Sequence, residues 1–262
     1  MVPIGAHVHD EDPLPAAAAA GADSVQFFLG DPQGWKAPAF PGGDPDGFTA
    51  RAAGDGLGLY VHAPYVINVA TGNNRIRIPS RKLLSQQLAA AARVGAKGLI
   101  VHGGHVTAGT DESEGYANWR KAVERIDRPL PMLIENTAGG DHAMARGLDG
   151  VARLWDAIAG AAADGSGEIG FCLDTCHAFC SGEELAGIAD RVKAITGRID
   201  LIHCNNSRDE FGSGRDRHAG LTDGTIDPAQ LLDVIRSAGA PVICETPDPG
   251  TDIRWLRDHL GG

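Results

Sequence analysis

Long apolar stretches are missing from this sequence. No apolar run approaches the ~18 residues that a membrane-spanning helix requires, and the alanine run at residues 16–20 is too weakly hydrophobic for the core of a signal peptide. Cysteine is also scarce, since the chain holds only five, which is an odd number. The sequence shows no export signal either. We therefore expect reduced thiols in a cytoplasmic protein that does not contact membranes.

Positive charge is in deficit as well. The 23 Lys and Arg residues are outnumbered by 34 Asp and Glu residues, which gives a formal net charge of −11. A simple nucleic-acid-binding protein should present a basic surface, so the composition argues against one unless cations offset the carboxylates. Three bound divalent ions would return about six positive charges to one place.

No linker, low-complexity tract or block of like charge divides the chain, which predicts a single domain over residues 1–262. Short apolar runs alternate with segments of helical spacing, such as residues 80–96, 148–163, 183–197 and 227–240. The apolar runs are Ile4–Val8, Ser24–Leu29, Leu57–His62, Gly98–His102, Pro131–Glu135, Glu168–Asp174, Asp200–His203 and Pro241–Glu245. Residues 30–58 are expected to form a long surface loop with a modest helix. Eight strands alternating with helices predict an α/β fold, a (β/α)8 TIM barrel, in preference to an open doubly wound sheet.

Histidines and carboxylates stand at the ends of six consecutive predicted strands. In a barrel of this kind the active site lies at the C-terminal ends of the strands. The candidate residues are His62, His102, Glu135, Asp174 and His177, His203 with Asp216 and His218 in the following loop, and Glu245. Without cations, such carboxylates would repel one another, which would raise their pKa values and cost stability.

Mixed imidazole and carboxylate ligation suits Zn²⁺, with Mn²⁺ or Fe²⁺ as alternatives. Nine ligands are too many for one ion, so the sequence predicts a cluster of ions. The spacing of Cys172, Cys176 and Cys180 could instead hold an iron–sulfur cluster. That alternative is disfavoured, because Cys172 belongs to an apolar strand run and Cys180 lies well beyond it.

Seven segments together resemble the endonuclease IV family of metal-dependent apurinic/apyrimidinic endonucleases. In chain order they read IGAHV, HAPYVIN, HGGH, IENTAGG, CLDTCHAF, HCNNSRDEFGSGRDRH and ICETPD. The resemblance runs over nearly the whole chain and implies a (β/α)8 barrel, in agreement with the strand count. It also implies cleavage of double-stranded DNA 5′ to abasic sites, leaving a 3′-OH and a 5′-deoxyribose phosphate. Clearance of blocked 3′ ends is implied too, and we expect a monomer.

By this resemblance each chain would hold three zinc ions. His62, His102 and Glu135 would hold the first ion, and Glu135 would bridge to the second. The second ion would also take Asp174, His203 and Glu245, and the third would take His177, Asp216 and His218. The ions would activate water and neutralise the phosphate and the leaving oxygen, which gives Glu135, Asp174 and Glu245 the main catalytic importance.

The sequence departs from the family in the segments that contact DNA. Residues 30–35 read GDPQGW, where the family often has an Asn-Gln-Arg-Gln-Trp run. Gln33 stands where Arg is common, whereas Trp35 is retained. Tyr65 and Val66 match the aromatic–aliphatic pair that probes the lesion, and Arg217 is a candidate phosphate contact. The resemblance therefore predicts intact site chemistry and an altered grip on DNA.

Two other functions fit parts of the pattern. A metal-dependent sugar isomerase or epimerase would share the barrel and the ligand types, but it usually needs one or two ions. The third set, His177, Asp216 and His218, would then be surplus, so this set distinguishes the two functions. A DNA- or metal-binding relative without activity is the second alternative, and the complete set of ligand residues argues against it.

Overall fold

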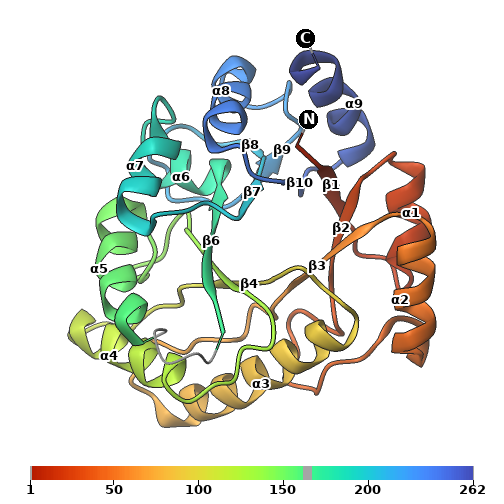
Figure 1. The fold of residues 1–262 in the computed structure, drawn as a ribbon. Coiled ribbons are helices and arrows are strands. Elements are labelled where there is room, and N and C mark those ends of the chain that lie inside the picture. The colour runs from red at the N-terminus through yellow and green to blue at the C-terminus, as the bar shows by residue number, and fades with distance from the viewer. Residues whose placement is uncertain (1, 162–166, 262) are drawn as a thin grey trace.

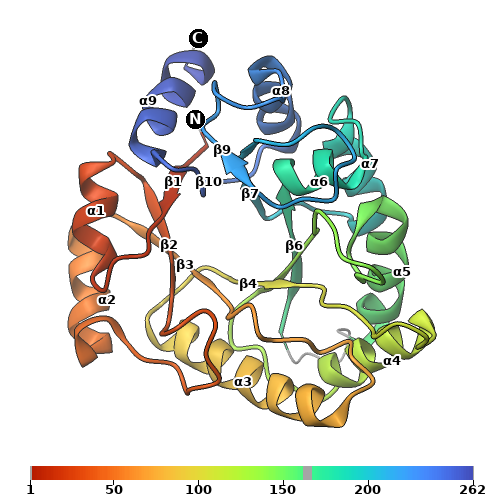
Figure 2. The ribbon, with the colours of Figure 1, turned by 180° about the vertical axis from the view of Figure 1, so that it is seen from behind.

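Eight parallel strands close into a barrel in the computed structural model, and helices cover its outside (Figures 1 and 2). The structure describes residues 2–161 and 167–261. The strands follow one another around the barrel in the order β1, β10, β7, β6, β5, β4, β3, β2. They are β1 (Ile4–His7), β2 (Ser24–Phe28), β3 (Gly58–His62), β4 (Leu99–His102), β5 (Met132–Glu135), β6 (Ile169–Asp174), β7 (Leu201–His203) and β10 (Val242–Cys244). Each lies within one of the predicted runs, so the predicted (β/α)8 barrel is confirmed.

Several helices begin at an aspartate cap. The side chains of Asp12, Asp44, Asp111, Asp227 and Asp248 each accept a hydrogen bond from a backbone N–H of the first turn. Each cap satisfies a donor that a helix N-terminus otherwise leaves unpaired. The helices are α1 (Pro13–Ala19), the 3₁₀ turn η1 (Pro41–Gly43), α2 (Pro45–Gly54), α3 (Asn74–Arg93), α4 (Glu112–Val123), α5 (Gly147–Ala159), α6 (Thr175–Ser181), α7 (Ile188–Thr196), α8 (Pro228–Ala238) and α9 (Pro249–Leu260).

The predicted helical segments correspond to α3, α5, α7 and α8, and residues 162–163 of the second segment lie outside the described residues. Residues 30–58 form the predicted loop with one helix, α2. None of the helices in the described part of the chain is long and apolar enough to cross a membrane.

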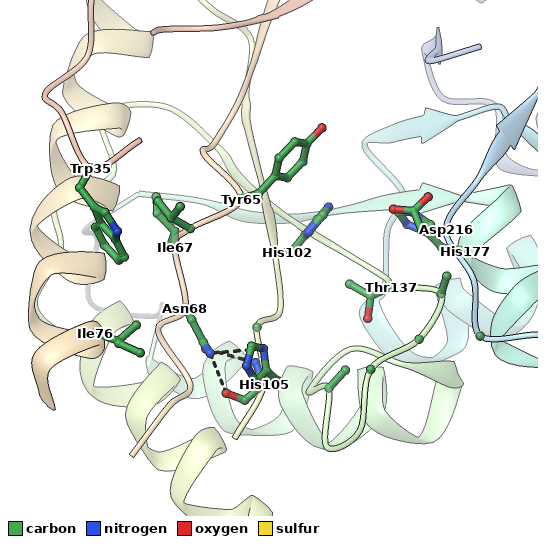
Figure 3. Close-up of a pocket in the computed structure, with 17 residues that line it drawn as sticks. Trp35, Tyr65, Ile67, Asn68, Ile76, His102, His105, Thr137, His177 and Asp216 are labelled. Atoms are coloured by element: carbon green, nitrogen blue, oxygen red, sulfur yellow. Dashed lines mark hydrogen bonds and ion pairs between the residues drawn. The ribbon is translucent and has the colours of Figure 1, made fainter. Parts of the chain in front are cut away.

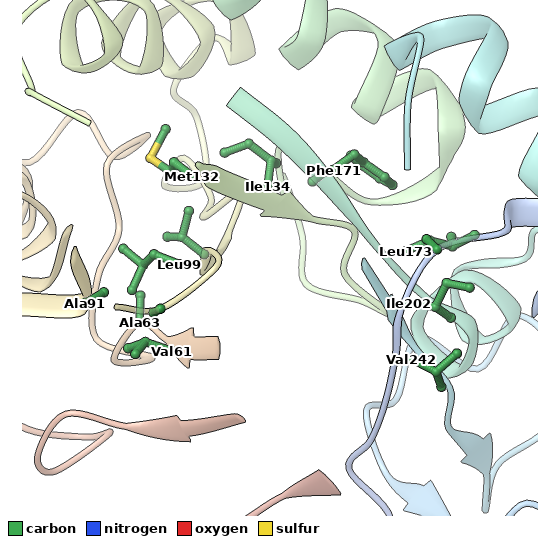
Figure 4. Close-up of a cluster of buried hydrophobic side chains, with 14 of the residues drawn as sticks. Val61, Ala63, Ala91, Leu99, Met132, Ile134, Phe171, Leu173, Ile202 and Val242 are labelled. Atoms are coloured by element: carbon green, nitrogen blue, oxygen red, sulfur yellow. The ribbon is translucent and has the colours of Figure 1, made fainter. Parts of the chain in front are cut away.

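Alternation along the strands separates two buried layers. One set of side chains points outward and packs beneath the helices; Leu99, Met132, Phe171 and Val242 belong to it (Figure 4). The other set fills the interior of the barrel. It consists of Tyr60, Ile100, Leu133, Cys172, Leu201 and Ile243, one from each of six strands. The barrel is therefore a packed core, and its open surface is the rim at the strand ends.

A small antiparallel pair, which the sequence did not predict, follows the seventh barrel strand. The strands β8 (Asn206–Ser207) and β9 (His218–Ala219) pair with each other and lie outside the barrel sheet. Two-residue strands are too short to show an alternating pattern. This pair returns the loop at residues 208–217 to the rim, so that His218 comes back to the strand ends.

Candidate metal centre

The predicted ligands stand one layer above the packed interior. Side chains on a strand face the same side at every second residue. Two positions beyond each of the six interior residues stand His62, His102, Glu135, Asp174, His203 and Glu245. The parallel register also places His102 beside Glu135 and Asp174 beside His203. The strands therefore deliver six possible ligands to one rim.

Glu135 lies at the middle of this layer and is 1% exposed. Its Oε2 is 3.2 Å from Nε2 of His62 and 3.1 Å from Nε2 of His102. Its Oε1 is 3.0 Å from Nδ1 of His203 and 3.3 Å from Nδ1 of His177. Each carboxylate oxygen thus faces its own pair of imidazoles. This arrangement suits a carboxylate that bridges two cations.

Among residues 2–161 and 167–261, four groups have ligand atoms within 4.8 Å of one another and could hold a metal ion. They are His62, His102 and Glu135; Glu135, Asp174, His203 and Glu245; Asp174, His177 and His218; and Cys176, Asp216 and His218. The first two have the composition that the family resemblance implies for two ions, and they share Glu135. Asp216 lies 3.1 Å from both His177 and His218, so the third expected set also comes together.

Hydrogen bonds fix which ring nitrogen of each histidine faces the site. Nδ1 of His62 is 2.8 Å from the carbonyl oxygen of Ala63, and Nδ1 of His177 is 2.8 Å from that of Asn136. A carbonyl can only accept, so both Nδ1 atoms donate and both Nε2 atoms are left for other partners. Nε2 of His177 and Nε2 of His218 are buried, and each faces Oδ1 of Asp216 at 3.1 Å. Such pinned imidazoles are typical of metal ligands.

His203 shows the reverse orientation. Its Nε2 is 2.8 Å from Oε1 of Gln26, an acceptor, so its Nδ1 faces Glu135 and Glu245. Nδ2 of Asn205 donates to Oδ2 of Asp174 over 2.7 Å and to Oε2 of Glu245 over 3.3 Å. These amides hold the second group in place.

The sequence alone did not predict these supporting amides. Gln26 is fully buried, and its Nε2 donates to Oε1 of Glu245 over 2.6 Å. The sequence did contain a sign of this role, because Gln26 is the one amide in the apolar run at residues 24–29. Asn136 donates to the carbonyl oxygen of Asp174 and accepts from its N–H, at 2.9 and 2.8 Å. Asn136 and Asn205 lie inside segments that resemble the family, but nothing in their spacing marked them as supports.

The loops after β5 and β7 approach each other closely. A Cβ built on Gly139 would lie 1.9 Å from the carbonyl oxygen of Gly214, so only glycine fits there. This contact brings the loop at residues 208–217 against the rim. Asp174, at the end of β6, is the N-cap residue of α6. Its Oδ1 accepts a hydrogen bond from the N–H of His177 over 2.6 Å. Local backbone structure thus places the third group.

The prediction that the carboxylates would have raised pKa values is wrong for Glu135, Glu245 and Asp216. Burial alone would raise the pKa of Glu135, but the nearby His203 and His102 hold it well below its usual range. Burial acts in the same direction on Glu245, and His203 again outweighs it, so its pKa is also low. The pKa of Asp174 is raised, mainly by burial, as predicted.

The histidines carry the compensating charge. Burial would lower the pKa of His177 and of His203, but neighbouring negative charge raises both well above the usual range. Contact with Asp216 and the charge of Asp174 likewise outweigh burial and raise the pKa of His218 to about 9. A divalent ion at these groups would displace the protons and take over the compensation.

The cysteines do not converge on an iron–sulfur site. Cys172 packs inside the barrel with Tyr60 and Leu133, whereas Cys176 and Cys180 pack with Ala138 in a separate cluster. All five cysteines are buried and free. A hydrogen bond with Cys180 and burial raise the pKa of Cys176 far above its usual range, which disfavours the thiolate that a metal would need.

A cleft of about 560 Å³ opens beside the metal centre. Trp35 and Ile76 line one end of it, His177 and Asp216 line the other, and Tyr65 lies between (Figure 3). Tyr65 is 50% exposed, and its ring lies 5.4 Å from that of His62, centroid to centroid. Its N–H donates to the carbonyl oxygen of Pro32 over 2.8 Å, which ties it to the loop that carries Trp35.

The other three residues predicted to contact DNA differ in where they lie relative to the cleft. Val66 lines the cleft, and Gln33 is exposed in the neighbouring loop without lining it. Arg217 is turned away, because its Nε donates to Oδ2 of Asp209 over 2.8 Å. The structure therefore brings Trp35, Tyr65 and Val66 to the cleft with the predicted ligands, but leaves Gln33 beside it and Arg217 outside.

This barrel with histidines and carboxylates at its rim belongs to a known class. Residues 14–260 match the model of the xylose isomerase-like TIM barrel family. A D-tagatose 3-epimerase-like protein of solved structure superposes with a TM-score of 0.79 at 16% identity over 99% of this chain and 97% of that chain. At that identity the likeness shows the fold alone.

Closer relatives identify the family. Proteins named probable endonuclease 4 are 57% identical in Mycobacterium tuberculosis, over 98% of this chain and 99% of the relative, and 55% identical in Mycobacterium leprae, over 99% of both. The crystal structure of endonuclease IV from Thermus thermophilus has a TM-score of 0.82 at 26% identity over 99% of both chains. The chain belongs to the endonuclease IV family.

Proposed function

We propose that this protein is a metal-dependent DNA repair endonuclease that cleaves the phosphodiester 5′ to abasic sites in double-stranded DNA. The products would be a 3′-OH and a 5′-deoxyribose phosphate, and the same site would clear blocked 3′ ends. The observation that carries the proposal is the convergence of nine histidine, aspartate and glutamate side chains on one rim, joined to family membership.

The residues fit a cluster of three Zn²⁺ ions. His62 and His102 would hold the first with Glu135, which would bridge to the second. Asp174, His203 and Glu245 would complete the second, and His177, Asp216 and His218 would hold the third. The buried Nε2 atoms of His177 and His218, which both face Oδ1 of Asp216 at 3.1 Å, support the third set. Bound there, the ions would activate water and stabilise the charge that develops on the phosphate and the leaving oxygen.

The chain itself would orient the reaction. Gln26 and Asn205 hold His203 and the carboxylates in one geometry, so the centre needs little reorganisation. Tyr65 and Val66 would occupy space beside the displaced abasic nucleotide, whose flipping costs little because it has no base to unstack. Trp35 would contact the DNA at the far end of the cleft. We infer that one chain suffices, because all nine ligands come from it.

A nicking assay tests this function. A duplex with one abasic site, labelled at one end, should be cut once, 5′ to the lesion, and the product should be extendable by a polymerase because it carries a 3′-OH. A duplex without the lesion should stay whole. Activity should disappear with a chelator and return with Zn²⁺. The same preparation should leave ketohexose epimers unchanged, whereas epimerisation without nicking would favour the sugar epimerase alternative.

A further inference from the structure

A second groove adjoins the cleft and lies along α3. It has a volume of about 580 Å³, and Trp35, Arg75, Ile78 and Lys82 are among the residues that line it. Trp35 lines both the cleft and this groove, so the two adjoin at that side chain. Figure 3 shows Trp35 standing beside α3, with Ile76 of that helix below it.

One face of α3 forms the wall of the groove. Arg75, Ile78 and Lys82 are spaced at i, i+3 and i+7, which places them on the same side of a helix. Ile78 is 62% exposed and Trp35 is 48% exposed, which is unusual for large apolar side chains. The apolar floor is therefore open to solvent and flanked by two cations.

Two other cations of α3 are engaged elsewhere. Arg77 donates to the carbonyl oxygen of Thr71 over 2.8 Å, and Arg81 donates to that of Asn118 over 3.0 Å. In the described part of the chain, by contrast, the side chains of Arg75 and Lys82 have no ion pair or hydrogen bond. They are exposed, uncompensated positive charges in a chain whose net charge is −11.

We propose that this α3 groove binds the sugar-phosphate backbone of duplex DNA flanking the lesion. Arg75 and Lys82 contact phosphates, and Trp35 and Ile78 pack against deoxyribose. Seven residues of helix separate the two cations by about 10 Å along the axis, so the two side chains can contact different phosphates. The inference rests on the proposed function, and it accounts for the grip on DNA despite the uncharged side chain at position 33.

The test compares salt dependence of binding. Each phosphate contact contributes about 0.9 to the slope of log K against log salt. The Arg75→Ala/Lys82→Ala variant should therefore lose about 1.8 from the slope, and its disadvantage should shrink about tenfold between 50 and 200 mM salt. The metal-loaded protein is titrated with a long intact duplex, which it does not cut. Because phosphate contacts carry no sequence or lesion information, the intact duplex reports them fully.

The matched control is Lys97→Ala/Lys121→Ala, which removes the same charge. Lys97 precedes β4 and Lys121 lies in the last turn of α4, so both are at the opposite end of the barrel from the metal centre. The control should keep the wild-type slope. On a duplex too short to reach α3, the Arg75→Ala/Lys82→Ala variant and the wild type should bind with equal affinity.

An unchanged slope in the α3 variant, or an equal drop in the control, would overturn the proposal. Loss of self-association with an unchanged slope would assign the groove to a second copy and overturn it too. Single-turnover nicking of abasic duplex is measured in parallel. If the wild type nicks but the slopes agree, this inference alone fails; if the wild type never nicks, the proposed function fails.

Discussion

At the scale of single residues, Glu135 is the side chain on which the proposed centre depends most. Each of its two carboxylate oxygens faces two imidazoles, and Glu135 belongs to two of the possible metal groups. Glu135→Gln keeps the shape but removes a charge that both ions would share. We expect nicking to fall by about 10³-fold, because metal charge supplies several kcal/mol and each ~1.4 kcal/mol is tenfold. Single-turnover rates with measured metal content check this.

Cys176→Ser is the control for that experiment. Cys176 lies near Asp216 and His218, so it could compete as a ligand, but its pKa is raised far above the usual range. We expect nearly wild-type nicking and metal content. Loss of metal from Cys176→Ser together with retention in Glu135→Gln would show that the proposed ligand set is wrong.

Gln26 offers a second residue-scale prediction. It touches His203 and Glu245 and contacts no metal in the proposed arrangement. Gln26→Leu keeps the volume but frees the imidazole of His203 to rotate. Supports of this kind typically cost 10- to 100-fold in metal affinity or activity when lost. A chelator competition should show a weakened ion at the second group, with the first unchanged. Equal affinity in both proteins would mean that Gln26 serves only to fill the barrel.

At the scale of elements, the loop at residues 30–35 is held by Asp31. Its Oδ1 accepts from the N–H of Gln33 over 2.9 Å, and its carbonyl oxygen accepts from the N–H of Gly34 over 3.1 Å. A Cβ on Gly34 would lie 2.9 Å from Oδ2 of Asp31, so the glycine fits this tight turn. The side chain at position 33 is exposed beside the cleft and can be exchanged without disturbing the turn.

Gln33→Arg should therefore tighten binding to abasic duplex. A long cation there can contact the phosphate-rich groove, with a gain of roughly 0.5–1.5 kcal/mol for a partly screened contact. The rate of cleavage of bound DNA should hardly change, because the metal ligands lie on other loops. Titration at two salt concentrations measures the first effect and single-turnover cleavage the second. Weaker binding, or a larger change in cleavage than in affinity, would exclude this loop from the grip on DNA.

The elements also show what a sequence can reveal. The eight barrel strands and five of the helices could be predicted, because buried strands and amphipathic helices leave periodic patterns. Six of the ligands could be placed at the rim because each stands at the end of a barrel strand, and the other three because they follow such an end. The strand pair β8–β9 could not be predicted, since its four residues are too few to show an alternating pattern of apolar and polar side chains. Arg217 was assigned to DNA by its position in a loop, but its pairing with Asp209 depends on the folded loop.

At the scale of the whole molecule, DNA affinity should depend on the bound metal. Without metal, the rim relies on protonated histidines to balance its carboxylates. The pKa of His218 is about 9, so this ring is charged below that pH and neutral above it. The affinity of metal-stripped protein should therefore be reduced at pH 7 and fall further through pH ~9. Metal-loaded protein should change less, because its ligands are not free to titrate.

Binding isotherms at constant salt, with circular dichroism to confirm the fold, measure this difference. Equal affinity with and without metal across that pH range would contradict the account of the rim.

The most direct test of the central claim is the metal content of active protein. Nine side chains converge on one rim in sets that could hold three ions. Elemental analysis of gently purified, nicking-competent protein should give about three divalent ions per chain, chiefly zinc. A reproducible single ion per chain in fully active protein would contradict a three-metal centre.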